Sequence, residues 1–154
     1  MASELKKLFD LATENAARIF KESGEVLPMW HAITGNDENM VIATPWSDDK
    51  EKDAAVAGLK SLFKIARVKR FAFIVEAWAR TVDPEEVGKP IEGRVSQHPD
   101  RREVLMVRAE DRDGTAMSGF YFILRPEHGK PTLSPLKIED YGTHTAGRMI
   151  GMLT

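Results

Sequence analysis

The sequence predicts an α+β fold, with an antiparallel β-sheet of about five to six strands and two main helices in the order α-β-β-α-β-β-β. Two observations and one packing argument lead to this prediction. Residues 3–22 and 48–67 place apolar side chains at three- and four-residue spacing, which is typical of amphipathic helices. The other apolar segments are short and bounded by turn residues, which favours strands joined as hairpins. The helices of such a chain must cover one or both faces of the sheet.

The first helix is expected to begin near Ser3, whose hydroxyl can accept a hydrogen bond from the first turn, and to end near Gly24. A hairpin follows, with strands expected in residues 25–34 and 39–44. Pro28 disfavours a central position at the start of the first strand, because proline lacks the N–H that a sheet ladder uses.

Either Ser47 or Asp48 is expected to cap the second helix. Gly58 lies inside this helix, where glycine costs about 1 kcal/mol relative to alanine, so it marks a position of close packing. The next segment, residues 70–81, is apolar on both alternating faces. That pattern predicts a central strand that is covered on both sides.

Two more strands are expected in residues 104–109 and 116–124, joined by a tight turn in which Gly114 can adopt positive φ. A last strand is expected near residues 133–138, and a short C-terminal helix near residues 146–152.

The whole chain, residues 1–154, is expected to form a single domain, since domains of this size are common. Its main anomaly is the polar loop of residues 82–102, because compact domains rarely carry so long a structureless loop unless it is functional or disordered.

Composition excludes several classes of protein. Lys and Arg number 22 against 24 Asp and Glu, a formal charge of −2, which argues against bulk binding of nucleic acid or acidic membrane but leaves a local patch open. The chain has no cysteine, so disulfides, thiol nucleophiles and thiolate metal sites are excluded. No transmembrane stretch or secretory signal is recognised, and the expected compartment is the cytoplasm.

Two residues are candidates for acid–base chemistry. Glu76 lies in the most apolar strand, on the face shared with Ile74 and Trp78, where a carboxylate needs a partner. It is either a general base or ligand anchor, or a structural group that pairs with a strand arginine such as Arg108 or is exposed at an uncovered part of the sheet. His31 is either an acid–base group or a hydrogen-bonded strand residue.

The end of the long loop is the densest polar run in the chain. His98, Asp100, Arg101 and Arg102 could bind an anion or an acidic partner, because arginine offers a fixed fork of donors. The alternative is a solvated loop.

A basic cluster in residues 60–70 lies at the end of the second helix, where cations complement the negative helix end. Contact with nucleic-acid phosphates is a minority hypothesis, since interleaved aromatic side chains are not evident. Glycine-rich phosphate loops, zinc-binding motifs and nucleophile elbows are absent, so no cofactor and no metal is predicted.

Several short runs, among them Thr44-Pro45-Trp46, Glu76-Ala77-Trp78 and His98-Pro99-Asp100, give the chain a familiar look. In these runs it resembles a set of small uncharacterised proteins from bacteria and their phages. The resemblance implies a single-domain prokaryotic or phage protein and assigns no catalytic residue.

The leading functional hypothesis is a small soluble binding or assembly module that self-associates or binds a protein partner, because antiparallel sheets with open edges commonly dimerise. The alternative is a small hydrolase-like enzyme that uses Glu76 and His31, with Arg101 or Arg102 as an anion clamp.

Overall fold

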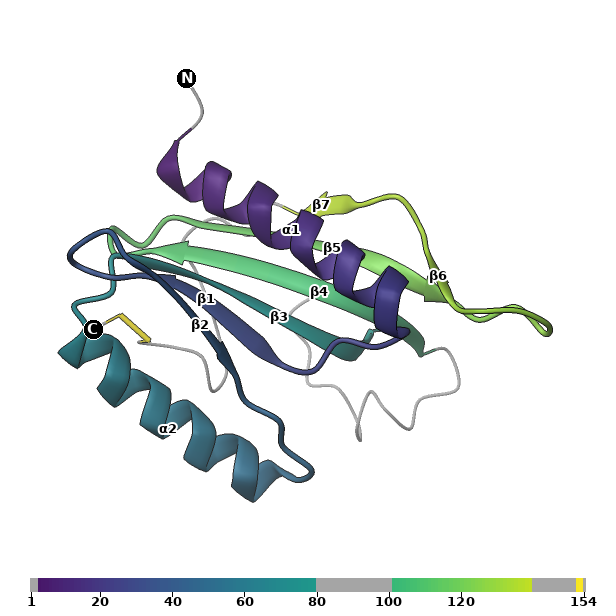
Figure 1. The fold of residues 1–154 in the computed structure, drawn as a ribbon, viewed down its shortest axis with the longest axis horizontal. Helices are drawn as coiled ribbons and strands as arrows, with labels where there is room; N and C mark the ends of the chain where they lie inside the picture. The colour runs from purple at the N-terminus through teal and green to yellow at the C-terminus, as the bar shows by residue number, and fades with distance from the viewer. Residues whose placement is uncertain (1–2, 80–100, 140–151, 154) are drawn as a thin grey trace, which may run out of the picture.

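The computed structural model describes residues 3–79, 101–139 and 152–153. Within them lie two helices and seven strands, which confirms the α+β class and the predicted order of elements (Figure 1). In chain order they are α1 (Glu4–Ser23), β1 (Met29–Ile33), β2 (Asn39–Ala43), α2 (Asp49–Ile65), β3 (Arg70–Ala79), β4 (Arg102–Asp111), β5 (Ala116–Leu124), β6 (Thr132–Leu133) and β7 (Lys137–Glu139). The expected last strand is therefore two short strands. Residues 82–100 of the long loop, and all of the expected C-terminal helix except Met152, lie outside the described residues.

The strands form one antiparallel sheet in the order β2-β1-β3-β4-β5-β6, and β7 also pairs with β5. As expected, β3 is an interior strand. β1 is interior as well, which corrects the inference from Pro28. The reason is that Pro28 precedes the strand, where it needs no N–H, and its carbonyl oxygen accepts a hydrogen bond from the Thr44 N–H at 2.8 Å.

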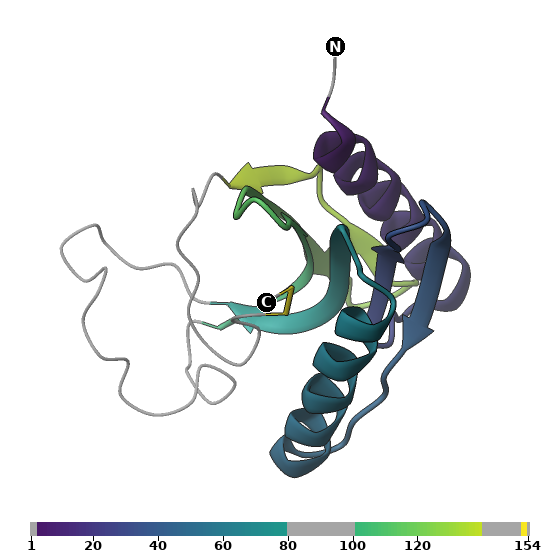
Figure 2. The same ribbon diagram turned by 90° about the vertical axis from the view of Figure 1, so that its left-hand side faces the viewer.

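The two helices lie on opposite faces of the curved sheet (Figure 2). We call the face under α1 the α1 face and the face under α2 the α2 face. Alternate residues of β3 show the division, because Ala72 and Ile74 belong to the α1 core whereas Phe71 and Phe73 belong to the α2 core. Each face is thus sealed by its own hydrophobic core.

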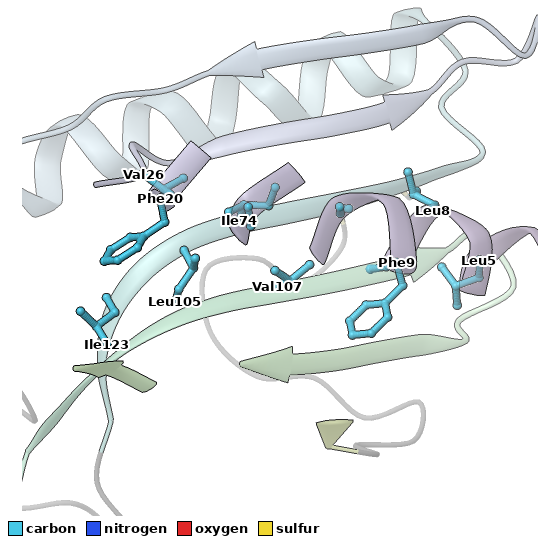
Figure 3. Close-up of a cluster of buried hydrophobic side chains, with 13 residues drawn as sticks. Leu5, Leu8, Phe9, Phe20, Val26, Ile74, Leu105, Val107 and Ile123 are labelled. Atoms are coloured by element: carbon cyan, nitrogen blue, oxygen red, sulfur yellow. The ribbon is translucent and has the colours of Figure 1, made fainter. Parts of the chain in front are cut away.

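Local capping explains where α1 begins and ends. The Ser3 hydroxyl accepts a hydrogen bond from the Lys6 N–H at 3.1 Å, and Gly24 ends the helix with φ of 78°. Phe9 and Phe20 on the buried stripe are 0% and 1% exposed. They point onto Leu105, Val107 and Ile123 of the sheet (Figure 3). The predicted first helix is confirmed.

The second helix is capped by Asp48, whose carboxylate accepts a hydrogen bond from the Glu51 N–H at 2.7 Å. Its buried stripe packs on Trp30, whose ring stacks on that of Phe73 at 4.2 Å between centroids. The close packing expected at Gly58 is not found among the described residues, since a Cβ placed there meets none of their atoms within 4 Å. Close approach occurs at Gly35 instead, where a Cβ would lie 2.9 Å from the Arg67 Cβ.

Candidate functional site

Glu76 lies on β3 at the α1 face, as the sequence predicts. Its carboxylate Oε2 accepts a hydrogen bond from the backbone N–H of Val26 at 2.6 Å, and the side chain is half-buried. The suggested ion pair with Arg108 is wrong, because the β3–β4 register sets Arg108 opposite Phe73 and directs it to the α2 face. Glu76 therefore fastens the segment between α1 and β1 to the sheet.

His31 lies on β1 and is 7% exposed. Its Nε2 is 2.8 Å from the Asn39 Oδ1, at the first residue of β2. This contact fits the second of the two predicted alternatives for His31, a hydrogen-bonded strand residue. It helps to join β1 to β2.

The two acid–base candidates share the α1 face but do not meet. The register pairs His31 with Ala72, four residues before Glu76 on β3. At about 3.3 Å per residue, this separates the two side chains by about 13 Å along the strand. The described residues therefore do not assemble the acid–base pair that the alternative hypothesis requires.

The two described arginines of the loop end also diverge. The Arg101 guanidinium lies 4.8 Å from the centroid of the Trp78 ring, and the Arg102 guanidinium lies 3.6 Å from that of Phe122. Trp78 is on the α1 face and Phe122 is on the α2 face, so Arg101 and Arg102 do not form one anion clamp. His98 and Asp100 lie outside the described residues.

A polar and aromatic cluster lies on the α1 face, where β3 and β5 end and β4 begins. It contains Glu76, Trp78, Arg101, Glu103 and Arg125. The Arg125 Nε donates to the Glu103 Oε2 at 2.5 Å, and this hydrogen bond raises the pKa of Arg125. Trp78 is 42% exposed. Because the cluster contains two glutamates beside its two arginines, it is not selective for a free anion.

A second charged pair lies on the α2 face, where the sequence pattern suggested only strand residues. The Arg108 Nη1 donates to the Ser118 Oγ at 3.3 Å, and its Nη2 lies 3.9 Å from the Glu110 Oε2. Burial lowers the pKa of Arg108 and raises the pKa of Glu110. That Nη2 is buried and makes no hydrogen bond within the described part of the chain. The sequence feature that could have indicated this pair is the presence of two charged residues, Arg108 and Glu110, at alternate positions of an otherwise apolar strand.

Two hollows adjoin α1, and neither contains a predicted catalytic residue. One, of about 600 Å³, is lined by Leu8, Leu11, Ile33, Asn39 and Arg70 together with four charged residues. The other, of about 520 Å³, is lined by Ala17, Phe20, Lys21 and residues 130–133. The three cations of the first hollow are already paired: Lys7 with Glu4, Lys69 with Asp37, and Arg70 with Asp111.

The outer edge of β2, which we call the β2 edge (Asn39–Ala43), lies at one end of the strand order. Within the described residues, β2 pairs only with β1. The backbone hydrogen bonds from Thr44 N–H to Pro28 O and from Thr34 N–H to Glu38 O show which opposite residues of β1 and β2 are hydrogen-bonded pairs. Because bonded and non-bonded pairs alternate, the N–H and C=O groups of Asn39, Val41 and Ala43 point away from β1.

The side chains of the β2 edge are all uncharged, and Val41 is 60% exposed. Sequence reasoning expected open edges in general and did not identify this one, because an edge is defined by sheet order.

Within residues 3–79, 101–139 and 152–153, no cluster of three His, Asp or Glu side chains could hold a metal ion. The helices of that part are too short or too polar to cross a membrane. Comparisons with protein-family models, with curated proteins and with solved structures find no match to this chain.

Proposed function

We propose that this protein is a binding module that self-associates by pairing the β2 edge of one copy with the β2 edge of a second. The observation that carries the proposal is the row of outward-pointing backbone groups on Asn39, Val41 and Ala43. An edge of this kind is a template for another strand, and natural sheets usually protect such edges with charge, proline or bulges.

A symmetric antiparallel pair can be centred on Val41. Val41 then faces Val41 of the second copy, Asn39 faces Ala43 of the second copy, and Ala43 faces its Asn39. Each of these three bonded pairs exchanges two backbone hydrogen bonds, about six in all. The side chains that face each other are uncharged, so no like charges oppose the association.

The two-fold axis of this arrangement is perpendicular to the sheet, because that axis turns a strand into an antiparallel neighbour. The two sheets then continue as one, with both α1 helices on one face and both α2 helices on the other. Strands of five residues bury less than the roughly 800 Å² per partner of a standard interface, so we expect a dissociation constant in the micromolar range.

The test is Val41→Pro, which removes one outward-pointing N–H and leaves the β1–β2 hydrogen bonds intact. Edge strands tolerate proline at such positions. Sedimentation velocity over a concentration series should show a reversible dimer for the wild type and a monomer for Val41→Pro. Val41→Thr keeps the backbone donor and should keep the dimer.

Urea denaturation of each variant checks that the fold is retained. A wild-type chain that stays monomeric up to hundreds of micromolar, or a Val41→Pro variant that dimerises as well as Val41→Thr, would overturn the proposal.

A further inference from the structure

The C-terminal end of α2 presents apolar and basic side chains to solvent side by side. Ile65 is 80% exposed and Leu62 is 37% exposed. Lys60 and Lys64 lie four residues apart on an adjoining side of the helix, and Arg67 follows the last turn. We call these five residues the basic tip. The tip contains no acidic residue, and none occurs in residues 54–69.

The cations of the tip are not used by the fold. Lys69 and Arg70, the other members of the predicted basic cluster, are paired with carboxylates. Lys60, Lys64 and Arg67, in contrast, make no side-chain hydrogen bond or ion pair within the described residues. They are free to contact a ligand.

These cations are also not needed to cap α2. Backbone N–H groups take the carbonyl oxygens at the helix end: Gly35 N–H bonds Ala66 O at 3.1 Å, and Val68 N–H bonds Phe63 O at 2.9 Å. Lys64 and Arg67 are exposed and Lys60 is partly buried, so the closure of the helix end does not occupy these three cations.

We propose that the basic tip binds the surface of an anionic membrane. The cations would contact lipid phosphates while Ile65, with Leu62 beside it, enters the boundary between headgroups and acyl chains. This combination of a basic surface with an adjoining apolar face is the chemistry of proteins that lie on a bilayer. The net charge of the whole chain is −2, so the attraction is local to this patch.

The shape and composition of the tip favour a membrane over the other acidic surfaces. Neither hollow beside α1 includes any tip residue, and Ile65 projects from a helix end, so a folded protein would need a pocket to receive it whereas a bilayer needs none. Single-stranded nucleic acid is bound by cations interleaved with aromatic stacking residues, and the tip contains no aromatic residue.

Each protomer carries its own tip, so this inference does not rest on self-association. Dimerisation would raise the apparent affinity, because both α2 helices of the proposed pair lie on one face and can bind one membrane together. The monomeric Val41→Pro variant should therefore still bind anionic vesicles, but more weakly.

The experiment is cosedimentation of the full chain with lipid vesicles at low salt. Vesicles of phosphatidylcholine containing about 30% phosphatidylglycerol should bind the protein, and pure phosphatidylcholine vesicles should not. Ile65→Ser should weaken binding by about tenfold and Lys64→Gln by about fivefold. The matched control is Ile138→Ser on β7, where an isoleucine that is 61% exposed lies outside the tip and should be replaceable without effect.

Three results would overturn the inference: no binding to the anionic vesicles, equal binding by Ile65→Ser and the wild type, or equal loss in Ile138→Ser. Salt-sensitive retention on a DNA duplex, without vesicle binding, would also overturn it by assigning the cations to nucleic acid.

Discussion

The two margins of the sheet differ in how well they are protected against pairing with another strand. The β2 edge is a single strand of five uncharged residues, uninterrupted by proline. The opposite margin is divided into two short strands, β6 and β7, with Pro131 before the first and Pro135 between them. Lys130 and Lys137 add charge there. Short strands, proline and lysine are the devices by which natural sheets prevent edge-to-edge association.

Hydrophobic exposure does not distinguish the two margins, because Val41 on β2 is 60% exposed and Ile138 on β7 is 61% exposed. The difference lies in the continuous row of outward backbone donors and acceptors that only a whole strand offers. Within residues 3–79, 101–139 and 152–153, one margin of the sheet is therefore protected and the other is unpaired, which supports the β2 edge as the interface.

The largest effect that we expect from this comparison comes from placing a lysine at each margin. Val41→Lys brings two like charges together at the two-fold axis of the proposed dimer, so the dissociation constant should rise by at least about tenfold. Ile138→Lys makes the same change at the protected margin and should leave self-association unchanged. Sedimentation velocity measures both; equal losses in the two variants would mean that the interface is not at β2.

A second comparison uses two glycines, one packed at the protected margin and one open. A Cβ at Gly119 on β5 would lie 3.0 Å from both the Lys137 carbonyl oxygen and the Phe9 Cζ. Gly119→Ala should therefore lower the free energy of unfolding by about 1–3 kcal/mol, because β7 or α1 must shift. At Gly58, inside α2, an added Cβ would meet no described atom. Gly58→Ala should therefore raise the free energy of unfolding by about 0.5–1 kcal/mol.

Urea denaturation gives both values, and self-association at the β2 edge should be unaffected by Gly119→Ala. A stabilising Gly119→Ala would show that β7 is not packed as described.

The parts of the fold that the sequence predicted are those set by local chemistry. Ser3 and Gly24 bound α1 because a hydroxyl cap and a left-handed glycine act within one turn of the helix. Gly114 closes the β4–β5 turn with φ of 91°, as expected for a tight hairpin. The apolar run in β3 predicted an interior strand because both of its faces had to be covered.

The contacts that define the candidate sites are non-local and could not be predicted in this way. Glu76 meets the N–H of Val26, fifty positions away in the sequence, only because β1 adds beside β3. The same pairing makes β1 an interior strand and leaves β2 as the margin. Residue types in Asn39–Ala43 are ordinary for a strand, so its role as an open edge follows from sheet order alone.

The smallest effect that we expect concerns the turn that leads into β2. Asp37 adopts φ of 62°, and its carboxylate lies 2.8 Å from the Lys69 ammonium. The hydrogen bond and charge of Lys69 lower the pKa of Asp37 in the folded chain. A carboxyl group with a lowered pKa stabilises the fold above its unfolded pKa, near 3.9, and loses that contribution as pH falls through its folded pKa.

Asp37→Asn keeps a residue type that tolerates positive φ, so it should reduce stability slightly at neutral pH and not at all in strong acid. Added salt should shrink the difference, because the pair is exposed to solvent. Asp113 is the matched control, since hydrogen bonds from Thr115, rather than a lysine, lower its pKa. Because the charge of Arg70 contributes only a minor part of the lowered pKa of Asp113, parallel urea titrations at two salt concentrations should show a larger salt dependence for Asp37→Asn than for Asp113→Asn. The same salt dependence in both would mean that the Lys69 contact adds nothing to the turn at the open margin.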